Sequence, residues 1–155
     1  MRAFCFLGGK MTGASVYRTE AEIEEVVKRL EQCTYSPEEF VHSKHLTVAA
    51  WYFCRLESET AREKMRAGLR RFIAHHGKHG YHVTITEFWL QLVERSVRQG
   101  QDNRGKNHRD PLSIVNEVVD RFRDKDLTHE YFSRARLNSA EAKAAWIEPD
   151  IKSIN

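Results

Sequence analysis

Apolar residues recur at intervals of three and four along most of the chain, which is the spacing of one face of an α-helix. The clearest stripe runs from Ile85 to Val97. The longest alternation typical of a strand is Tyr81 to Ile85, and this segment fits a helix start better. The pattern therefore predicts an all-α protein, a helical bundle of four to five main helices with a short-helix C-terminal extension.

Capping signals predict where the helices begin. Thr19 and Glu22 form a capping box, and Ser36 followed by Pro37 indicates a second helix that runs to about Glu57. A later helix is predicted to begin near Ile85, with Thr84 and Glu87 as its capping box. The other predicted starts are Ser58, Asp110-Pro111, Thr128 and Ser139.

The length of 155 residues suits one domain with a substantial core, and 41% hydrophobic residues is typical of a globular chain. We predict a single helical-bundle domain over residues 18–155. Residues 1–17 contain little pattern and are interpreted as a weakly ordered N-terminal arm, in which either Met1 or Met11 is the native start.

Charge and apolar runs argue against two classes of partner. The net charge of +3 is mild, and the arginines of segments 62–71 and 95–109 alternate with acidic residues, so a solvated helix face is favoured over a nucleic-acid surface. No apolar run approaches the roughly 20 residues of a membrane span. Three cysteines without a Cys-x-x-Cys spacing indicate reduced thiols and predict a cytoplasmic protein.

Histidines provide the most distinctive chemistry. On a helical wheel, His42 and His45 lie on the apolar side of the second predicted helix, one turn apart. His82 extends the apolar face of the helix around Phe88 backwards by one turn. In an up-down-up-down bundle these two helices are parallel, so the three imidazoles are expected at the same level.

Three imidazoles suit a divalent transition metal such as Zn, Fe or Ni, with an open position for water or substrate. Tyr81, Thr86 and Glu39 are candidates to orient water or substrate beside the predicted ligands, which are His42, His45 and His82. The alternative is that the histidines are satisfied polar groups that close one end of the bundle. No motif indicates a nucleotide or organic cofactor.

The same residues resemble a group of small, uncharacterised bacterial helical proteins. The shared pattern is Phe-x-His-x-x-His-Leu, then His-Gly, then Tyr-His-x-Thr-x-Thr-x-x-Trp, here at residues 40–46, 76–77 and 81–89. The segments 132–137 and 146–151 are also similar. The resemblance implies that the three histidines act together, although Val83 stands where such proteins often have Glu. Bundle metalloproteins of the DinB type are a more distant analogy.

Two functions remain open. The chain is either a metal-dependent enzyme that acts on a small molecule, or a non-catalytic binding or assembly module in which the histidines are structural. Val48 and Trp51 lie opposite the histidines on the second predicted helix. If they are exposed, they mark a homodimer surface; the alternative is that this helix is central and buried all round.

Overall fold

The computed structural model describes residues 15–101 and 109–155. Its long helices are α2 (Glu20–Glu31), α3 (His42–Arg55), α4 (Ser58–His75), α5 (Val83–Gln101) and α6 (Pro111–Arg121). The short elements that follow are the 3-10 turn η2 (Lys125–Leu127) and the helices α7 (Thr128–Tyr131), α8 (Arg134–Leu137) and α9 (Ala140–Ala144). These two ranges contain no strand, which confirms the all-α fold with a C-terminal extension of short helices.

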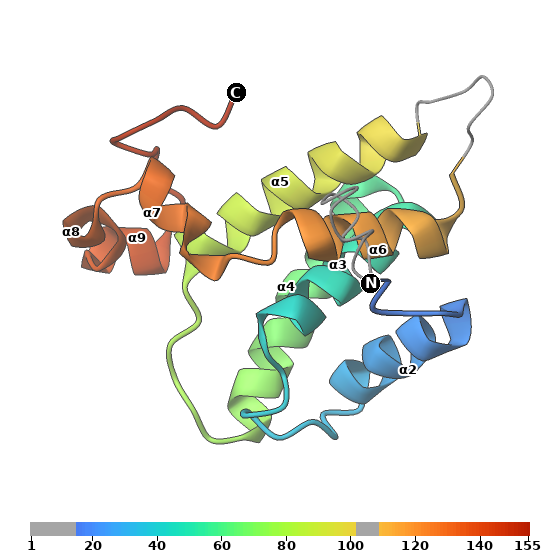
Figure 1. Cartoon of the computed structure of the whole chain (residues 1–155). Helices are drawn as coiled ribbons and strands as arrows, with labels where there is room; N and C mark the ends of the chain where they lie inside the picture. Colours follow the sequence, from blue (N-terminus) through green and yellow to red (C-terminus); the bar gives the residue numbers. More distant parts are fainter. Residues whose placement is uncertain (1–14, 102–108) are drawn as a thin grey trace, which may run out of the picture.

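Helix α3 lies at the centre of the fold and packs against α2, α4, α5 and α6 (Figure 1). Its buried residues are Leu46, Thr47, Val48, Ala49, Ala50, Trp51, Tyr52 and Phe53. Both Val48 and Trp51 are thus buried, at 0% and 7% exposure. The exposure on which a homodimer surface at these two residues depended is therefore absent, and the alternative of a central, buried helix is confirmed.

The helices α3 and α5 run in the same direction, as the sequence predicted. Arg98, near the end of α5, donates a hydrogen bond to the carbonyl of Phe53, near the end of α3. Helix α4 runs the opposite way along α5. Ser58, at the start of α4, contacts Arg98 near the end of α5, whereas Arg66, further along α4, contacts Glu87 near the start of α5. The starts of α3 and α5 therefore lie at the same end of the bundle.

The C-terminal helices pack around the start of α5 (Figure 1). Phe88 and Leu92 of α5 form a second apolar cluster with Phe132 and Leu137. Phe132 is fully buried, and burial of a phenylalanine side chain stabilises a fold by roughly 1.5–3 kcal/mol. This cluster fixes the position of the chain that follows α6.

The second predicted helix begins later than expected. Ser36 and Glu39 do exchange the hydrogen bonds of a capping box, at 3.2 and 3.0 Å, but these bonds close only one turn. Phe40 then turns into the core, Val41 is extended, and the helix begins at His42. The prediction of a helix from Ser36 is wrong because burial of Phe40 interrupts the helical backbone.

Two further expectations need correction. The capping box of Thr84 and Glu87 is absent: Thr84 is buried and bonds the backbone of the C-terminal segment, while Glu87 pairs with Arg62 and Arg66 of α4. Residues 1–14 of the predicted N-terminal arm lie outside the described residues. Tyr17, however, is part of the core and its backbone N–H donates to Asn116 at 2.9 Å.

Among the residues that the structure describes, no helix has both the length and the hydropathy needed to cross a bilayer. The thiols of Cys33 and Cys54 are free. Burial raises the pKa of the Cys54 thiol to about 12, so this sulfur is a weak nucleophile at neutral pH.

Candidate functional site

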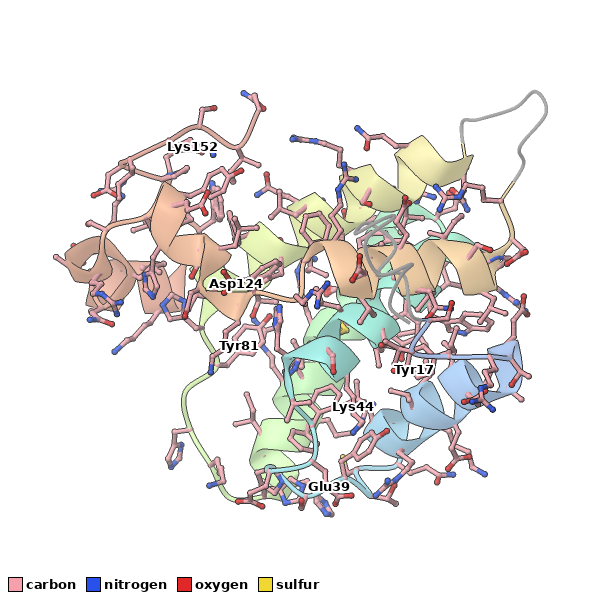
Figure 2. All side chains as sticks on the ribbon, viewed as in Figure 1. Tyr17, Glu39, Lys44, Tyr81, Asp124 and Lys152 are labelled. Carbon is pink, nitrogen blue, oxygen red and sulfur yellow. The ribbon has the colours of Figure 1, made fainter. Side chains whose placement is uncertain are left out.

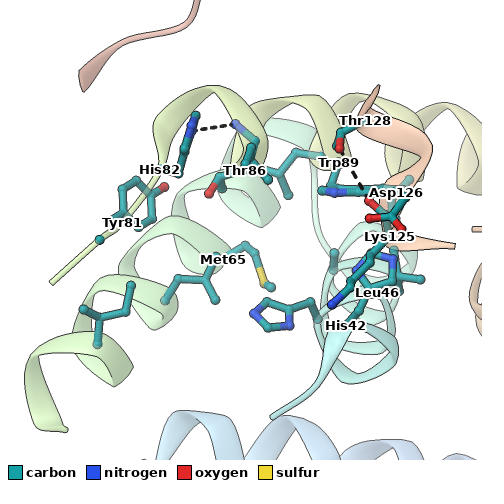
Figure 3. A pocket seen from close by; sticks show the side chains of 18 of the residues that line it. His42, Leu46, Met65, Tyr81, His82, Thr86, Trp89, Lys125, Asp126 and Thr128 are labelled. Atoms are coloured by element: carbon teal, nitrogen blue, oxygen red, sulfur yellow. Dashed lines mark hydrogen bonds between the residues drawn. The ribbon is translucent and has the colours of Figure 1, made fainter. Parts of the chain in front are cut away.

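A cavity of about 420 Å³ opens between the starts of α3 and α5, one face of α4, and the segment formed by η2 and α7 (Figure 3). Apolar side chains make most of its wall. They include Leu46 on α3, Met65 and Leu69 on α4, and Ile85, Trp89 and Val93 on α5. The parallel arrangement of α3 and α5 brings His42, His45 and His82 to this cavity, and all three line it.

His42 is half-buried and packs against Trp89, with ring centroids 4.6 Å apart and the ring planes tilted by 60°. Its Nε2 atom donates a hydrogen bond to the carbonyl of Phe122 at 2.9 Å. Burial lowers the pKa of His42 below its usual value, although the Phe122 carbonyl acts in the opposite direction. The ring is therefore neutral at pH 7, protonated on Nε2, and its Nδ1 atom is a hydrogen-bond acceptor.

His45 has the opposite tautomer. Its Nδ1 atom donates to the carbonyl of Val41 at 3.1 Å, and its ring packs on Phe40 with centroids 4.2 Å apart. Burial lowers the pKa of His45 to about 4, with a smaller contribution from the neighbouring His42. This imidazole is neutral at pH 7, so its Nε2 atom is an acceptor.

His82 uses both of its ring nitrogens on the protein backbone. Its Nδ1 atom accepts a hydrogen bond from the N–H of Ile85 at 3.2 Å, and its Nε2 atom donates to the carbonyl of Leu137 at 2.8 Å. Figure 3 shows its ring on the α5 side of the pocket, across from His42. His82 has no nitrogen lone pair left for a metal ion.

The described residues contain no group of three or more His, Cys, Asp or Glu side chains arranged to hold a metal ion. The three histidines line the same cavity, but each ring bonds a different backbone carbonyl. A three-imidazole centre would require His82 to give up at least the hydrogen bond that its Nδ1 atom accepts from the Ile85 N–H. The arrangement does not fit the metal site expected from the sequence.

Of the three candidates for orienting water or substrate, Tyr81 and Thr86 line the cavity and Glu39 does not. Glu39 bonds Ser36 and Arg29 and lies well away from Tyr81 in Figure 2. The Tyr81 hydroxyl points towards Thr86 in Figure 3. Burial raises the pKa of Tyr81, so the hydroxyl stays protonated at neutral pH.

No sequence pattern predicted one wall of the cavity. It is formed by Lys125, Asp126, Thr128 and His129, from the short elements after α6. Lys125 and Asp126 are exposed and of opposite charge, so together they leave the wall without net charge. No periodicity marks this polar stretch, and the buried cluster around Phe132 brings it back to α5.

Three further histidines at and just after the end of α4, His75, His76 and His79, lie outside the cavity lining. His76 donates from Nε2 to the carbonyl of Tyr35 at 2.9 Å and packs on Phe72. It therefore ties the end of α4 to the connection before α3. His75 and His79 are exposed, as expected for a solvated helix end.

Comparison of this chain with protein-family models, with curated proteins and with solved structures finds no match.

Proposed function

We propose that the protein is a binding module for a small, uncharged, largely apolar molecule that carries a hydrogen-bond donor. The observation that carries this proposal is the cavity of about 420 Å³, which is mostly apolar and is lined by two neutral imidazoles. Binding pockets for small molecules generally have volumes of about 300–1,000 Å³, apolar walls and a few fixed polar groups.

The polar groups of the cavity define the chemistry of the ligand. His42 and His45 each donate their one ring N–H to a backbone carbonyl. The other ring nitrogen of each is therefore an acceptor, which suits an O–H or N–H group on the ligand. A charged ligand would lose much of its hydration against the apolar walls, and the charged residues of the lining, Lys125 and Asp126, are exposed and have opposite signs. An uncharged donor on an apolar body is the best complement.

Fluorescence of N-phenyl-1-naphthylamine, an uncharged aromatic amine with one N–H, tests this proposal. We expect saturable binding with one probe per chain. The anionic analogue 1-anilinonaphthalene-8-sulfonate has the same rings plus a sulfonate, and we expect it to bind at least about tenfold more weakly, because ions are costly to desolvate. The N-methylated amine, which lacks the N–H donor, should bind about 2- to 12-fold more weakly than the parent amine.

Two tryptophan variants locate the binding. Thr86→Trp places a large ring in the cavity and should abolish probe binding, whereas Thr60→Trp makes the same change at an exposed position outside its lining. Circular dichroism checks that both variants are folded. Equal probe affinity in the two variants, or tighter binding of the sulfonate than of the amine, would overturn the proposal.

A further inference from the structure

His45 lies on the α4 side of the cavity, whereas His42 lies on the α5 side. The ring of Phe40 packs on the His45 imidazole, with centroids 4.2 Å apart, and on Phe72 of α4, with centroids 5.1 Å apart. His42 instead packs against Trp89 of α5. The α4 residues that line the cavity are all apolar, and they are Met65, Leu69 and Ile73. His45 therefore brings a polar ring to a largely apolar corner of the cavity.

The free ring nitrogen of His45 faces the cavity. In the described part of the chain this imidazole makes one hydrogen bond, in which Nδ1 turns back to the Val41 carbonyl, so Nε2 points away from the start of α3. Nε2 is not among the buried side-chain polar atoms that lack a partner in that part of the chain, so it keeps accessible surface. Because the ring lies deep in the protein and lines the cavity, this surface belongs to the cavity.

The chemistry of this corner restricts the ligand group that can pair with His45 Nε2. Carboxylic acids and aliphatic amines are charged at pH 7, so neither suits an apolar corner. An amide brings a carbonyl that needs a donor of its own, and the N–H of His45 is already given to Val41. A hydroxyl needs only the acceptor that is present. A phenol is a stronger donor than an alkanol because it is more acidic, yet it stays protonated at pH 7.

We propose that the ligand is an alcohol or phenol whose hydroxyl lies at one end of the molecule and donates to His45 Nε2. This inference rests on the proposed function and specifies its ligand class. His45 is then the residue that selects the hydroxyl, and the apolar body of the ligand extends between α4 and α5, against Leu69 and Trp89.

Three naphthalenes with the same rings test this inference by isothermal titration calorimetry at pH 7. They are 2-naphthol, 2-methoxynaphthalene, which has no donor, and 2-naphthamide, which adds a carbonyl. An apolar cavity without an acceptor prefers the ether, because a hydroxyl loses water without gaining a partner. We expect 2-naphthol to bind about 2- to 12-fold more tightly than the ether, which is the range for one hydrogen bond, and more tightly than the amide.

Two variants assign the preference to His45. His45→Leu removes the acceptor, so the ether should bind this variant at least as tightly as 2-naphthol does. His75→Leu makes the same change at an exposed position outside the cavity lining and should keep the wild-type preference. Circular dichroism checks that both variants are folded. Nitrogen-15 NMR of the wild type needs no variant: the His45 Nε2 resonance should move further with 2-naphthol than with the ether.

The outcomes separate this inference from the proposed function. If N-phenyl-1-naphthylamine binds but 2-naphthol is not preferred over the ether and the amide, the hydroxyl ligand is excluded while the binding function stands. A preference that survives in folded His45→Leu, or an Nε2 resonance that moves equally with both ligands, also excludes it. If neither the amine nor any of the naphthalenes binds, both proposals fall.

Discussion

The Nε2 atom of His82 donates a hydrogen bond to the carbonyl oxygen of Leu137 at 2.8 Å, and so joins the start of α5 to the end of α8. The other ring nitrogen accepts from the N–H of Ile85, at the position where a capping side chain bonds the third residue of a helix. One imidazole thus caps a helix and holds the C-terminal extension in place.

Replacement of His82 should therefore reduce stability. We expect His82→Ala to lower the free energy of unfolding by about 1–3 kcal/mol, because a helix cap is lost and the Leu137 carbonyl loses its donor. His82→Asn keeps a capping acceptor and should recover part of that loss. Urea denaturation measures both variants. A zinc-dependent rise in the wild-type midpoint that His82→Ala abolishes would contradict this structural role.

The two imidazoles of α3 make stability depend on pH. Burial lowers the pKa of His45 from 6.5 to about 4, and burial also lowers that of His42. Between pH 6.5 and 4 the unfolded chain binds protons that the folded chain does not bind, so stability is retained above pH 6.5 and decreases as the pH falls. For His45 alone the slope approaches about 1.4 kcal/mol per pH unit.

Comparison with His45→Gln isolates this effect, since the other titrating groups are common to both proteins. We expect the free energy of unfolding to fall less steeply from pH 7 to pH 5 in His45→Gln than in the wild type. Urea denaturation at closely spaced pH values gives both slopes. Parallel curves would show that His45 titrates normally in the folded protein.

The carboxylate of Glu87 joins α5 to α4 through two arginines. It is 2.8 Å from Arg66 and 3.4 Å from Arg62, with 14% of its side chain exposed. We expect Glu87→Gln to lower the free energy of unfolding by about 1–3 kcal/mol, because two half-buried guanidinium groups lose a charged acceptor. Glu63, whose side chain is 64% exposed and 3.6 Å from Arg66, is the control. Glu63→Gln should cost less than about 0.5 kcal/mol in the same denaturation experiment.

The hydroxyl of Thr84 joins the first turn of α5 to the segment after α9. It donates to the carbonyl of Ala145 at 2.8 Å and accepts from the N–H of Ile147 at 3.2 Å, in a fully buried position. Thr84→Val keeps the shape but leaves two backbone groups without partners, so we expect a loss of about 1–3 kcal/mol.

Thr84→Ser keeps the hydroxyl and loses only a methyl group, so it should be the milder change. Hydrogen exchange at the Ile147 amide provides a local measurement: it should be faster in Thr84→Val and close to wild type in Thr84→Ser. A Thr84→Val protein as stable as the wild type would show that the two backbone groups find other partners.

Local signals predicted much of the fold. The capping box of Thr19 and Glu22 and the start at Asp110-Pro111 are confirmed, because each depends only on residues within one turn. The parallel arrangement of α3 and α5 also follows from helix order and short connections. Ser36 shows the limit of such signals, since a complete capping box there closes only one turn once Phe40 enters the core.

The site was predicted less completely, for a physical reason. Spacing and helix order predict His42, His45 and His82 at the same end of the bundle, and they do line one cavity. Spacing does not predict which carbonyl oxygens accept hydrogen bonds from these rings. The Phe122 carbonyl is 80 residues from His42 along the chain, and the Leu137 carbonyl is 55 residues from His82. His129 carries no local signal either, because its place in the wall depends on how the C-terminal helices pack.

The wall formed by η2 and α7 also has a consequence for synthesis of the protein. The helices α2 to α6 can leave the ribosome and begin to pack while the cavity still lacks Lys125 to His129, and α5 still lacks the carbonyl that His82 bonds. One wall of the cavity and the acceptor for His82 are therefore completed only after residues 125–137 have left the ribosome and packed against α5.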